Sequence, residues 1–140
     1  MRIMIEVCIQ SRKAPMPDCP FCSVEPSRTW IDNEHAVAFS DAYPVADGHT
    51  LVMPRKHVNS IYELNATEQS AIWDFVAAVR YRLLIGLKPD GFNIGVNDGL
   101  AAGQNVEHAH VHVIPRKSGD VPDPRGGIRW IIAEHAKYWE

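Results

Sequence analysis

Three histidines at alternating positions are the residues whose types and spacing most clearly indicate chemistry. His108, His110 and His112 alternate with Ala109 and Val111. Side chains of a β-strand point alternately to its two faces, so a strand here would place all three imidazoles on one face, about 6.6 Å apart. Two chemistries use such a row. The histidines can hold a catalytic Zn²⁺ with an open coordination position, or the central imidazole can attack an electrophile while its neighbours orient it.

The segment before the histidines carries groups that suit phosphate. Asn97 ends an apolar run, and the Gly-containing loop that follows contains Gln104 and Asn105. Amide side chains and the backbone N–H groups of such a loop donate hydrogen bonds to phosphate oxygens. An ordinary turn is the alternative for the loop alone, but its position directly before the histidines favours a phosphate site.

A cysteine pair near the start of the chain is a second group of possible ligands. Cys19 and Cys22 have the spacing of a zinc site, a redox pair or two buried thiols. The third cysteine, Cys8, is assigned no role. His35 and His135 have no partner that the sequence identifies.

Short strands and one long helix must position these residues. Asn65 with Glu68 three residues later predicts the start of a helix, and apolar residues at helical spacing extend it from about 66 to 87. The other face of the histidine segment should pack beneath this helix. We predict strands at 29–32, 36–39, 51–53, 92–96 and 109–114. The pattern indicates an antiparallel α+β domain.

Length and composition limit the number of domains and exclude several classes of protein. The 140 residues fit one domain, placed at 17–140, with a leader at 1–16 and a C-terminal extension from about 118. A net charge of −3 gives no positive field that would attract nucleic acid or anionic membranes. No apolar run reaches the roughly 18 residues of a membrane span, and the first residues lack a signal-peptide core, so a cytoplasmic location is expected.

The run from His108 to Ile114 matches, at all seven positions, the His-x-His-x-His-x-x signature (x apolar) of the histidine triad superfamily of nucleotide hydrolases and transferases. The resemblance covers about residues 17–117, because the segments 19–22, 41–44, 48–57 and 97–104 follow in the family's order. It implies an α+β fold with an antiparallel sheet of about five strands and one long helix. It also implies pairing of two such sheets across a two-fold axis into a homodimer.

The resemblance assigns roles around the phosphate. It makes His110 the nucleophile, which forms a nucleotidyl-histidine intermediate at the α-phosphate, with His112 contacting the phosphate. Asn97, Gln104 and Asn105 lie where family members place polar groups near the phosphate or the scissile bridge. Related enzymes carry Ser or Thr at the position of Asn105. A nucleophilic imidazole needs one nitrogen free and the other protonated and held by an acceptor.

Three residues are candidates for binding the nucleoside. Asp41 matches the position that family members use to bind the ribose hydroxyls, and a carboxylate is the natural acceptor for two O–H groups. The alternative is that Asp41 only begins a turn. Phe21 and Phe39 are candidates for an apolar slot around the base, although aromatic residues are as often part of the core.

Relatives that carry the cysteine pair bind zinc. The resemblance implies a closed, structural tetrahedral site formed by Cys19, Cys22, His57 and His108. His49 flanks the same strand as His57 and is its competitor as the third ligand. With His108 bound to zinc, the other two histidines of the row remain free for phosphate.

We therefore expect a nucleotide hydrolase or transferase, with a dinucleoside polyphosphate as the favoured substrate. Residues 103–120 resemble the fragile histidine triad branch, which cleaves such substrates, whereas the cysteine pair and the segment ending at His57 resemble the zinc-containing bacterial members. Three alternatives stay open: a nucleoside phosphoramidate hydrolase, a non-catalytic nucleotide-binding module, and a metal hydrolase with zinc on all three histidines of the row.

Overall fold

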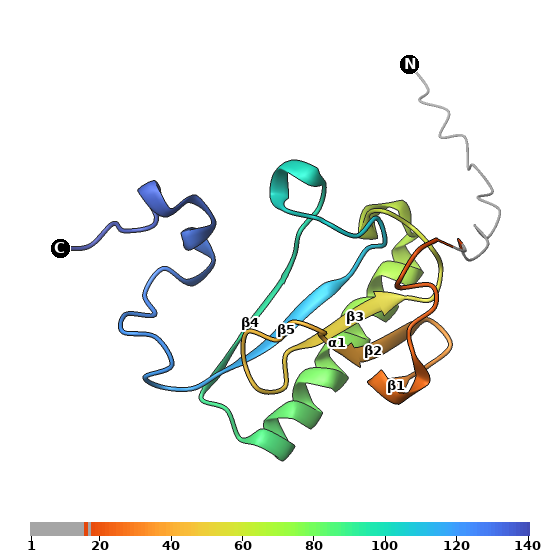
Figure 1. The fold of residues 1–140 in the computed structure, drawn as a ribbon, viewed down its shortest axis with the longest axis horizontal. Helices are drawn as coiled ribbons and strands as arrows, with labels where there is room; N and C mark the ends of the chain where they lie inside the picture. Colours follow the sequence, from red (N-terminus) through yellow and green to blue (C-terminus); the bar gives the residue numbers. More distant parts are fainter. Residues whose placement is uncertain (1–15, 17) are drawn as a thin grey trace.

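The computed structural model describes residue 16 and residues 18–140, and five strands in this part of the chain form one antiparallel sheet (Figure 1). The strands lie in the order β1-β2-β3-β5-β4. Their bounds are Thr29–Asp32 for β1, Ala36–Ser40 for β2, Thr50–Pro54 for β3, Gly91–Val96 for β4 and Val111–Arg116 for β5. Four 3-10 helices lie before, between or after them: η1 (Pro26–Arg28), η2 (Ile61–Glu63), η3 (Leu100–Ala102) and η4 (Gly127–His135). Cys8 and nearly all of the expected leader lie outside the described residues.

The one long helix, α1 (Ala66–Leu87), has the predicted bounds. Its N-terminus is capped reciprocally, because the Asn65 side chain accepts from the Glu68 backbone N–H at 2.9 Å and the Glu68 carboxylate accepts from the Asn65 N–H at 3.0 Å. The predicted α+β fold, an antiparallel five-stranded sheet with one main helix, is confirmed. Within the described chain, no helix combines the length and apolar character needed to cross a bilayer.

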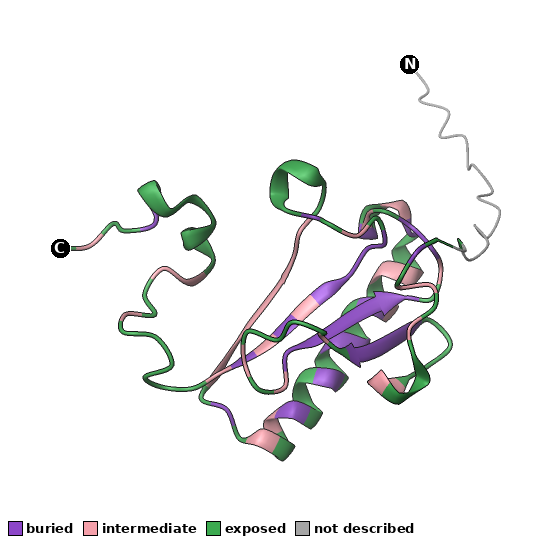
Figure 2. Ribbon diagram, in the orientation of Figure 1, coloured by how far each residue is buried: buried purple, intermediate pink, exposed green. Residues whose placement is uncertain are grey.

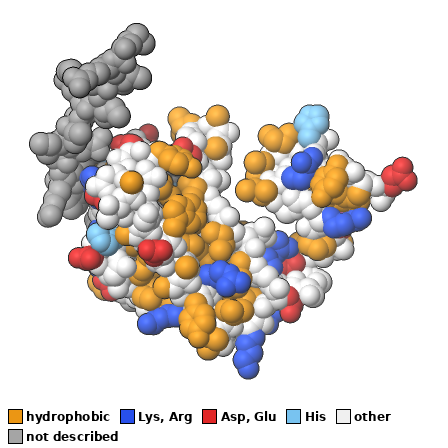
Figure 3. Space-filling view, turned by 180° about the vertical axis from the view of Figure 1, so that it is seen from behind, with side chains coloured by type: hydrophobic (Ala, Val, Ile, Leu, Met, Phe, Trp, Pro, Cys, Tyr) orange, Lys and Arg blue, Asp and Glu red, His pale blue; other side chains and the backbone are white. Residues whose placement is uncertain are grey.

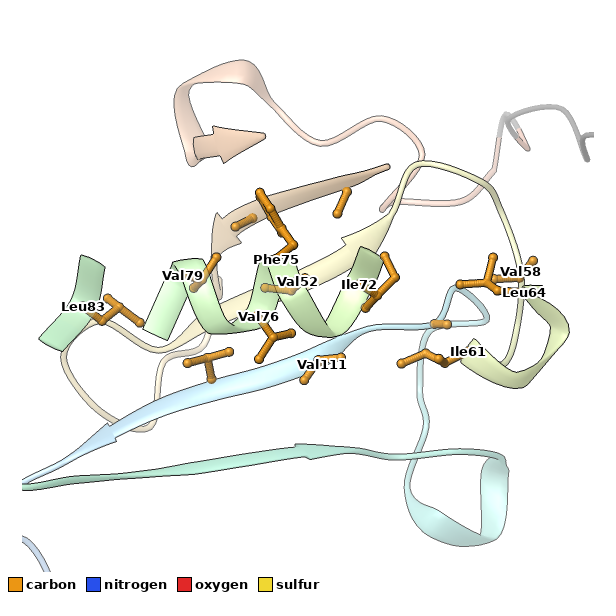
Figure 4. Close-up of a cluster of buried hydrophobic side chains, with 14 residues drawn as sticks. Val52, Val58, Ile61, Leu64, Ile72, Phe75, Val76, Val79, Leu83 and Val111 are labelled. Atoms are coloured by element: carbon orange, nitrogen blue, oxygen red, sulfur yellow. The ribbon is translucent and has the colours of Figure 1, made fainter. Parts of the chain in front are cut away.

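The main core fills the layer between α1 and one face of the sheet (Figure 4). The central strands are the most deeply buried part of the chain (Figure 2). Ala109, Val111 and Val113 are at most 2% exposed and belong to this layer, as predicted from their alternation with the histidines. The side chains of this core are Ala36, Ala38, Val52, Val58, Ile61, Leu64, Ile72, Phe75, Val76, Val79, Leu83, Ala109, Val111 and Val113.

The strand that carries the histidines begins later than predicted. β5 starts at Val111, so His112 lies in the strand, but His108 and His110 precede it. The strand predicted at 109–114 is therefore found at 111–116, and the prediction that it carries all three histidines was wrong. The ladder between β3 and β5 ends at the pair Val52–Val111 because β3 ends at Pro54, which has no N–H to donate. The Ala109 N–H donates instead to the Val58 carbonyl at 2.7 Å.

One glycine brings the loop between β2 and β3 against the end of α1. Gly48 has φ +81°, and a Cβ added there would lie 2.4 Å from the Leu87 side chain. Glycine is required at this position for both reasons. The close approach fixes the backbone directly before His49.

The C-terminus of α1 generates a test of backbone strain. Lys88 caps the helix with φ 48°, a left-handed conformation that disfavours any residue with a Cβ. We expect Lys88→Gly to raise the free energy of unfolding by about 0.5–1 kcal/mol, measured by urea denaturation. Arg82→Gly removes the same charge inside the helix and should lower it by about 1 kcal/mol. Destabilisation by both substitutions would contradict a strained cap.

Candidate active site and metal centre

Two thiols and two imidazoles converge beside the end of β3. The candidate ligand atoms of Cys19, Cys22, His57 and His108 all lie within 4.8 Å of one another. The Sγ of Cys22 is 3.2 Å from Nδ1 of His57 and 3.6 Å from Nδ1 of His108, and the Sγ of Cys19 is 3.6 Å from Nδ1 of His108. These are the four residues that the resemblance assigned to zinc.

The donor set fits a tetrahedral Zn²⁺. With Zn–S near 2.3 Å and Zn–N near 2.0 Å, tetrahedral angles separate sulfur and nitrogen by about 3.5 Å, close to the distances found. His108 contacts the Pro54 carbonyl oxygen through Nε2 at 2.8 Å, which leaves Nδ1 as the ligand atom. Burial raises the pKa of the Cys22 thiol, so its thiolate requires a nearby cation. A zinc ion here would join the segment around residues 19–22 to the sheet.

His110 presents one ring nitrogen for attack. Its Nδ1 lies 2.7 Å from the backbone carbonyl oxygen of His108, an atom that only accepts, so Nδ1 carries the proton. In the neutral form of the ring, Nε2 therefore has a free lone pair. The ring is 8% exposed and lies between Phe21 and His112, with centroid distances of 5.0 and 5.2 Å. This is the tautomer that nucleophilic attack through Nε2 requires.

His112 contacts His49, and the tautomers of both rings follow from one backbone donor. The Val45 N–H donates to Nδ1 of His49 at 3.2 Å, so the proton of the neutral His49 ring is on Nε2. That Nε2 lies 2.9 Å from Nδ1 of His112, which accepts. The remaining nitrogen of His112, Nε2, therefore carries a proton and is a donor.

The local environment favours the neutral form of His112 and His49. Burial, helped by the neighbouring His110 and His49 rings, lowers the pKa of His112 to about 4. Burial also lowers the pKa of His49, and the Asp41 carboxylate only partly opposes that effect. At neutral pH His112 is consequently an uncharged N–H donor.

Asp41 supports both interpretations offered from the sequence. One carboxylate oxygen accepts from the Tyr43 N–H at 2.8 Å, which is a turn-forming contact. The other lies 3.4 Å from Nε2 of His49, so the carboxylate borders the histidine row. Binding of ribose by Asp41 stays a prediction.

The loop before the histidines is held together by Gln104. This side chain is 6% exposed; its oxygen accepts from the Gly99 N–H at 2.8 Å, and its nitrogen donates to the carbonyls of Asn59 and Val106. Gln104 therefore shapes the loop, and its contact with substrate stays a prediction. Asn97 follows the pair Val96–Val111, so continued register places it on the face of His112, beside His110. Asn105 is exposed.

The two phenylalanines expected around the base differ in accessibility. Phe39 has no exposed surface and lies beneath Phe21, with the ring centroids 5.2 Å apart. Phe21 is half-buried and lines a cavity of about 500 Å³. A base could thus contact Phe21 directly, whereas Phe39 supports that ring from below.

His49 is the functional residue that the sequence interpretation misplaced. It was weighed only as a zinc ligand, but its ring lies between Asp41 and His112, away from the cysteines. Its spacing from Leu51, which pairs with His112, was the available signal, because residues two apart share a face. His35 and His135 lie outside both clusters; His35 pairs with Glu34 on the surface.

The metal centre generates a direct test. We expect about one Zn²⁺ per chain by metal analysis, and Cys22→Ser should lose the metal together with several kcal/mol of stability, because structural zinc contributes to folding. His49→Gln, which changes the competing ligand, should retain the zinc. Stoichiometric zinc after replacement of both cysteines would transfer the metal to the histidine row and support a metal hydrolase.

Sequence and structure comparisons relate the chain to known proteins. Residues 23–119 match the HIT domain family. The chain is 43% identical over 102 residues to an uncharacterised HIT-like protein of Mycoplasma genitalium, covering 70% of this chain and 72% of that protein. It is 34% identical over 94 residues to the asymmetrical bis(5'-nucleosyl)-tetraphosphatase of Schizosaccharomyces pombe, covering 67% and 52%. A Streptococcus mutans crystal structure superposes with a TM-score of 0.74 at 36% identity, covering 81% and 75%. The chain therefore belongs to the HIT domain family.

Proposed function

We propose that this chain is a nucleotide hydrolase that transfers a nucleotidyl group first to His110 and then to water. The observation that carries the proposal is the contact between Nδ1 of His110 and the His108 carbonyl, because it leaves Nε2 unprotonated. A buried lone pair on a neutral ring is ready to attack without prior loss of a proton. HIT family relatives that act on nucleotides support the same class of reaction.

In the first step, the lone pair of His110 Nε2 forms a bond to the α-phosphorus, and the bond from phosphorus to the leaving group breaks with its electron pair going to the leaving group. The substituted ring becomes positively charged. The His108 carbonyl, already hydrogen-bonded to Nδ1–H, stabilises that charge. His112 Nε2–H can donate to a phosphate oxygen or to the departing atom.

In the second step, water forms a new bond to phosphorus and the P–N bond breaks. The electron pair returns to His110, which becomes neutral again, and the proton of the water passes to solvent. Asn97 and Asn105 are proposed to hold the phosphate during both steps, within the loop that Gln104 braces.

A dinucleoside polyphosphate is the substrate class that we favour. The S. pombe relative is named for hydrolysis of such a compound. We place the ribose at Asp41 and the base against Phe21, with Phe39 behind it. The alternative is a nucleoside phosphoramidate: the His112 N–H, next to the proposed nucleophile, would donate a hydrogen bond to the departing amine nitrogen, and the amine would take its proton from solvent.

We also propose that two copies pair through β4 and that the protein works in the cytoplasm. The free edges of the sheet are β1 and β4. β1 has four residues and an irregular register against β2, whereas β4 pairs regularly over six residues. Irregular, short edges resist pairing, so β4 is the better edge for a two-fold sheet. The cytoplasmic location rests on the composition of the sequence.

Trapping the intermediate tests the proposal. Zinc-loaded protein would be mixed with a dinucleoside polyphosphate labelled at the α-phosphate and quenched in base, because a P–N bond to histidine survives base and breaks in acid. We expect labelled wild-type protein, no label on His110→Asn, and a loss of turnover of several orders of magnitude in that variant. His135→Asn, at the surface, is the matched control and should behave as wild type. Near-normal turnover by folded His110→Asn would exclude the mechanism.

A further inference from the structure

Arg28 is a half-buried cation that takes no part in the chemistry proposed above. It is the last residue of η1, directly before β1, and its guanidinium carbon lies over the Phe39 ring, 5.4 Å from the ring centroid. One guanidinium N–H donates to the Ser40 carbonyl at 2.9 Å. Phe39 belongs to the cluster on the face of β2 that points away from α1. The Arg28 side chain is therefore held against that face.

The charge of Arg28 has no carboxylate partner in the part of the chain that the structure describes. Arg55, Arg116 and Arg125, by contrast, each form an ion pair with an aspartate. Figure 3 shows other Lys and Arg side chains that stand at the surface on one side of the molecule. Arg28 is less hydrated than these, and one of its five N–H donors has a partner among the described residues. The remaining donors are available for acceptor atoms of a ligand.

The nucleoside position proposed above brings a base close to this guanidinium. Phe39 and Asp41 are two residues apart, and the Asp41 N–H donates to the His49 carbonyl at 3.0 Å, which continues the pairing of β2 with β3. The Phe39 ring and the Asp41 carboxylate therefore share a face. A ribose at Asp41 and a base against Phe21 flank Phe39, because the two phenylalanine rings meet edge-on at 5.2 Å. The Arg28 guanidinium lies over the same Phe39 ring, so it would border the edge of that base.

A guanidinium distinguishes purines by the acceptors on their edge. Guanine and hypoxanthine present two neighbouring acceptors, O6 and N7, which match two N–H groups of an arginine. Adenine presents N7 beside the amino group N6, which is a donor, so it offers one acceptor and places a donor against a donor. Contact with Arg28 would therefore favour 6-oxopurines over adenine.

We infer that Arg28 is a specificity-determining residue that selects guanine or hypoxanthine as the base of the transferred nucleotide, a role that rests on the nucleotidyl transfer proposed above. The guanidinium keeps its hydrogen bond to the Ser40 carbonyl and directs its remaining N–H groups to O6 and N7 of the base. Arg28 does not touch the reacting phosphorus. Its contribution is therefore equal in the ground state and the transition state and falls on binding.

Three substrates that differ only in their bases test this selection. They are diguanosine, diinosine and diadenosine triphosphate, turned over by zinc-loaded full-length protein; both halves of each carry the same base, so either half can enter the site. We expect kcat/KM to be about tenfold higher for the guanine and hypoxanthine compounds than for the adenine compound. Arg28→Lys keeps the charge but not the paired donors and should remove most of this preference. Arg28→Ala should remove all of it.

Arg80→Ala is the matched control. Arg80 also lies over a phenylalanine, with its guanidinium carbon 4.9 Å from the Phe92 ring centroid, but it belongs to α1. This variant should keep the preference. Equal losses on all three substrates with Arg28→Ala would overturn the inference, because Arg28 would then act only by holding the backbone at Ser40. A preference for guanine that hypoxanthine does not share would also overturn it, because the 2-amino group would then be the recognised feature.

Binding to a variant without the nucleophile separates base selection from the proposed function. In zinc-loaded His110→Asn, calorimetry should show GMP and IMP binding about tenfold more tightly than AMP, and addition of Arg28→Ala should equalise the three. If the wild type turns over none of the substrates but this binding preference is found, the hydrolase proposal fails and base selection stands. If turnover occurs with no base preference in turnover or binding, base selection is wrong and the hydrolase proposal stands.

A guanidinium can also bind a phosphate group, and the same variants test that role. Guanosine 3′,5′-bisphosphate carries a second phosphate on the ribose, next to the position of Asp41. We expect Arg28→Ala, in the His110→Asn background, to weaken binding of this compound and of GMP by the same factor of about ten. A larger loss for the bisphosphate would make Arg28 a phosphate ligand and would overturn base selection.

Discussion

The hydrogen bond from Nδ1 of His110 to the His108 carbonyl determines what the rest of the site can do. That carbonyl is held firmly, because the His108 side chain contacts Pro54 through Nε2 and two cysteines through Nδ1. The next residue, Ala109, donates its N–H to Val58. One residue thus joins the candidate metal centre to the proposed nucleophile. A substitution of either cysteine should therefore alter the environment of His110 through His108.

The two faces of the histidine segment have separate tasks. Ala109, Val111 and Val113 lie in the main core beneath α1, which fixes the backbone. The opposite face carries polar rings in a poorly hydrated environment, where burial lowers the pKa of His112 and keeps it neutral. The proposed nucleophile, His110, therefore stands beside an uncharged donor. The apolar core therefore holds the backbone that positions the histidine rings.

The sequence predicted those features that depend on local pattern. Reciprocal capping by Asn65 and Glu68 defined the start of α1, and the alternation around Val111 identified the core face. Features that depend on contacts between distant segments were not accessible. His49 is 63 residues from His112, and only the pairing of β3 with β5 brings their rings together. The later start of β5 follows from Pro54 on a strand whose pairing partner no local pattern specifies.

The C-terminal segment, residues 118–140, shows the same limit more strongly. Its position beside β4 depends on Ile128, which lies close to Gly95. Its own conformation depends on internal contacts of Arg129 and Trp130 that no sequence motif predicts. The sequence indicated only a C-terminal extension from about residue 118. Three-dimensional packing brings it against β4.

The protonation of the His110 ring can be measured directly by nitrogen NMR on zinc-loaded protein labelled at the histidine ring nitrogens, at about pH 7. We predict that Nδ1 of His110 carries the proton and that Nε2 carries none. His112 serves as an internal reference in the same spectrum, because its contact with His49 requires the opposite tautomer, with the proton on Nε2. A His110 ring protonated on Nε2, or on both nitrogens, would contradict a nucleophile poised for attack.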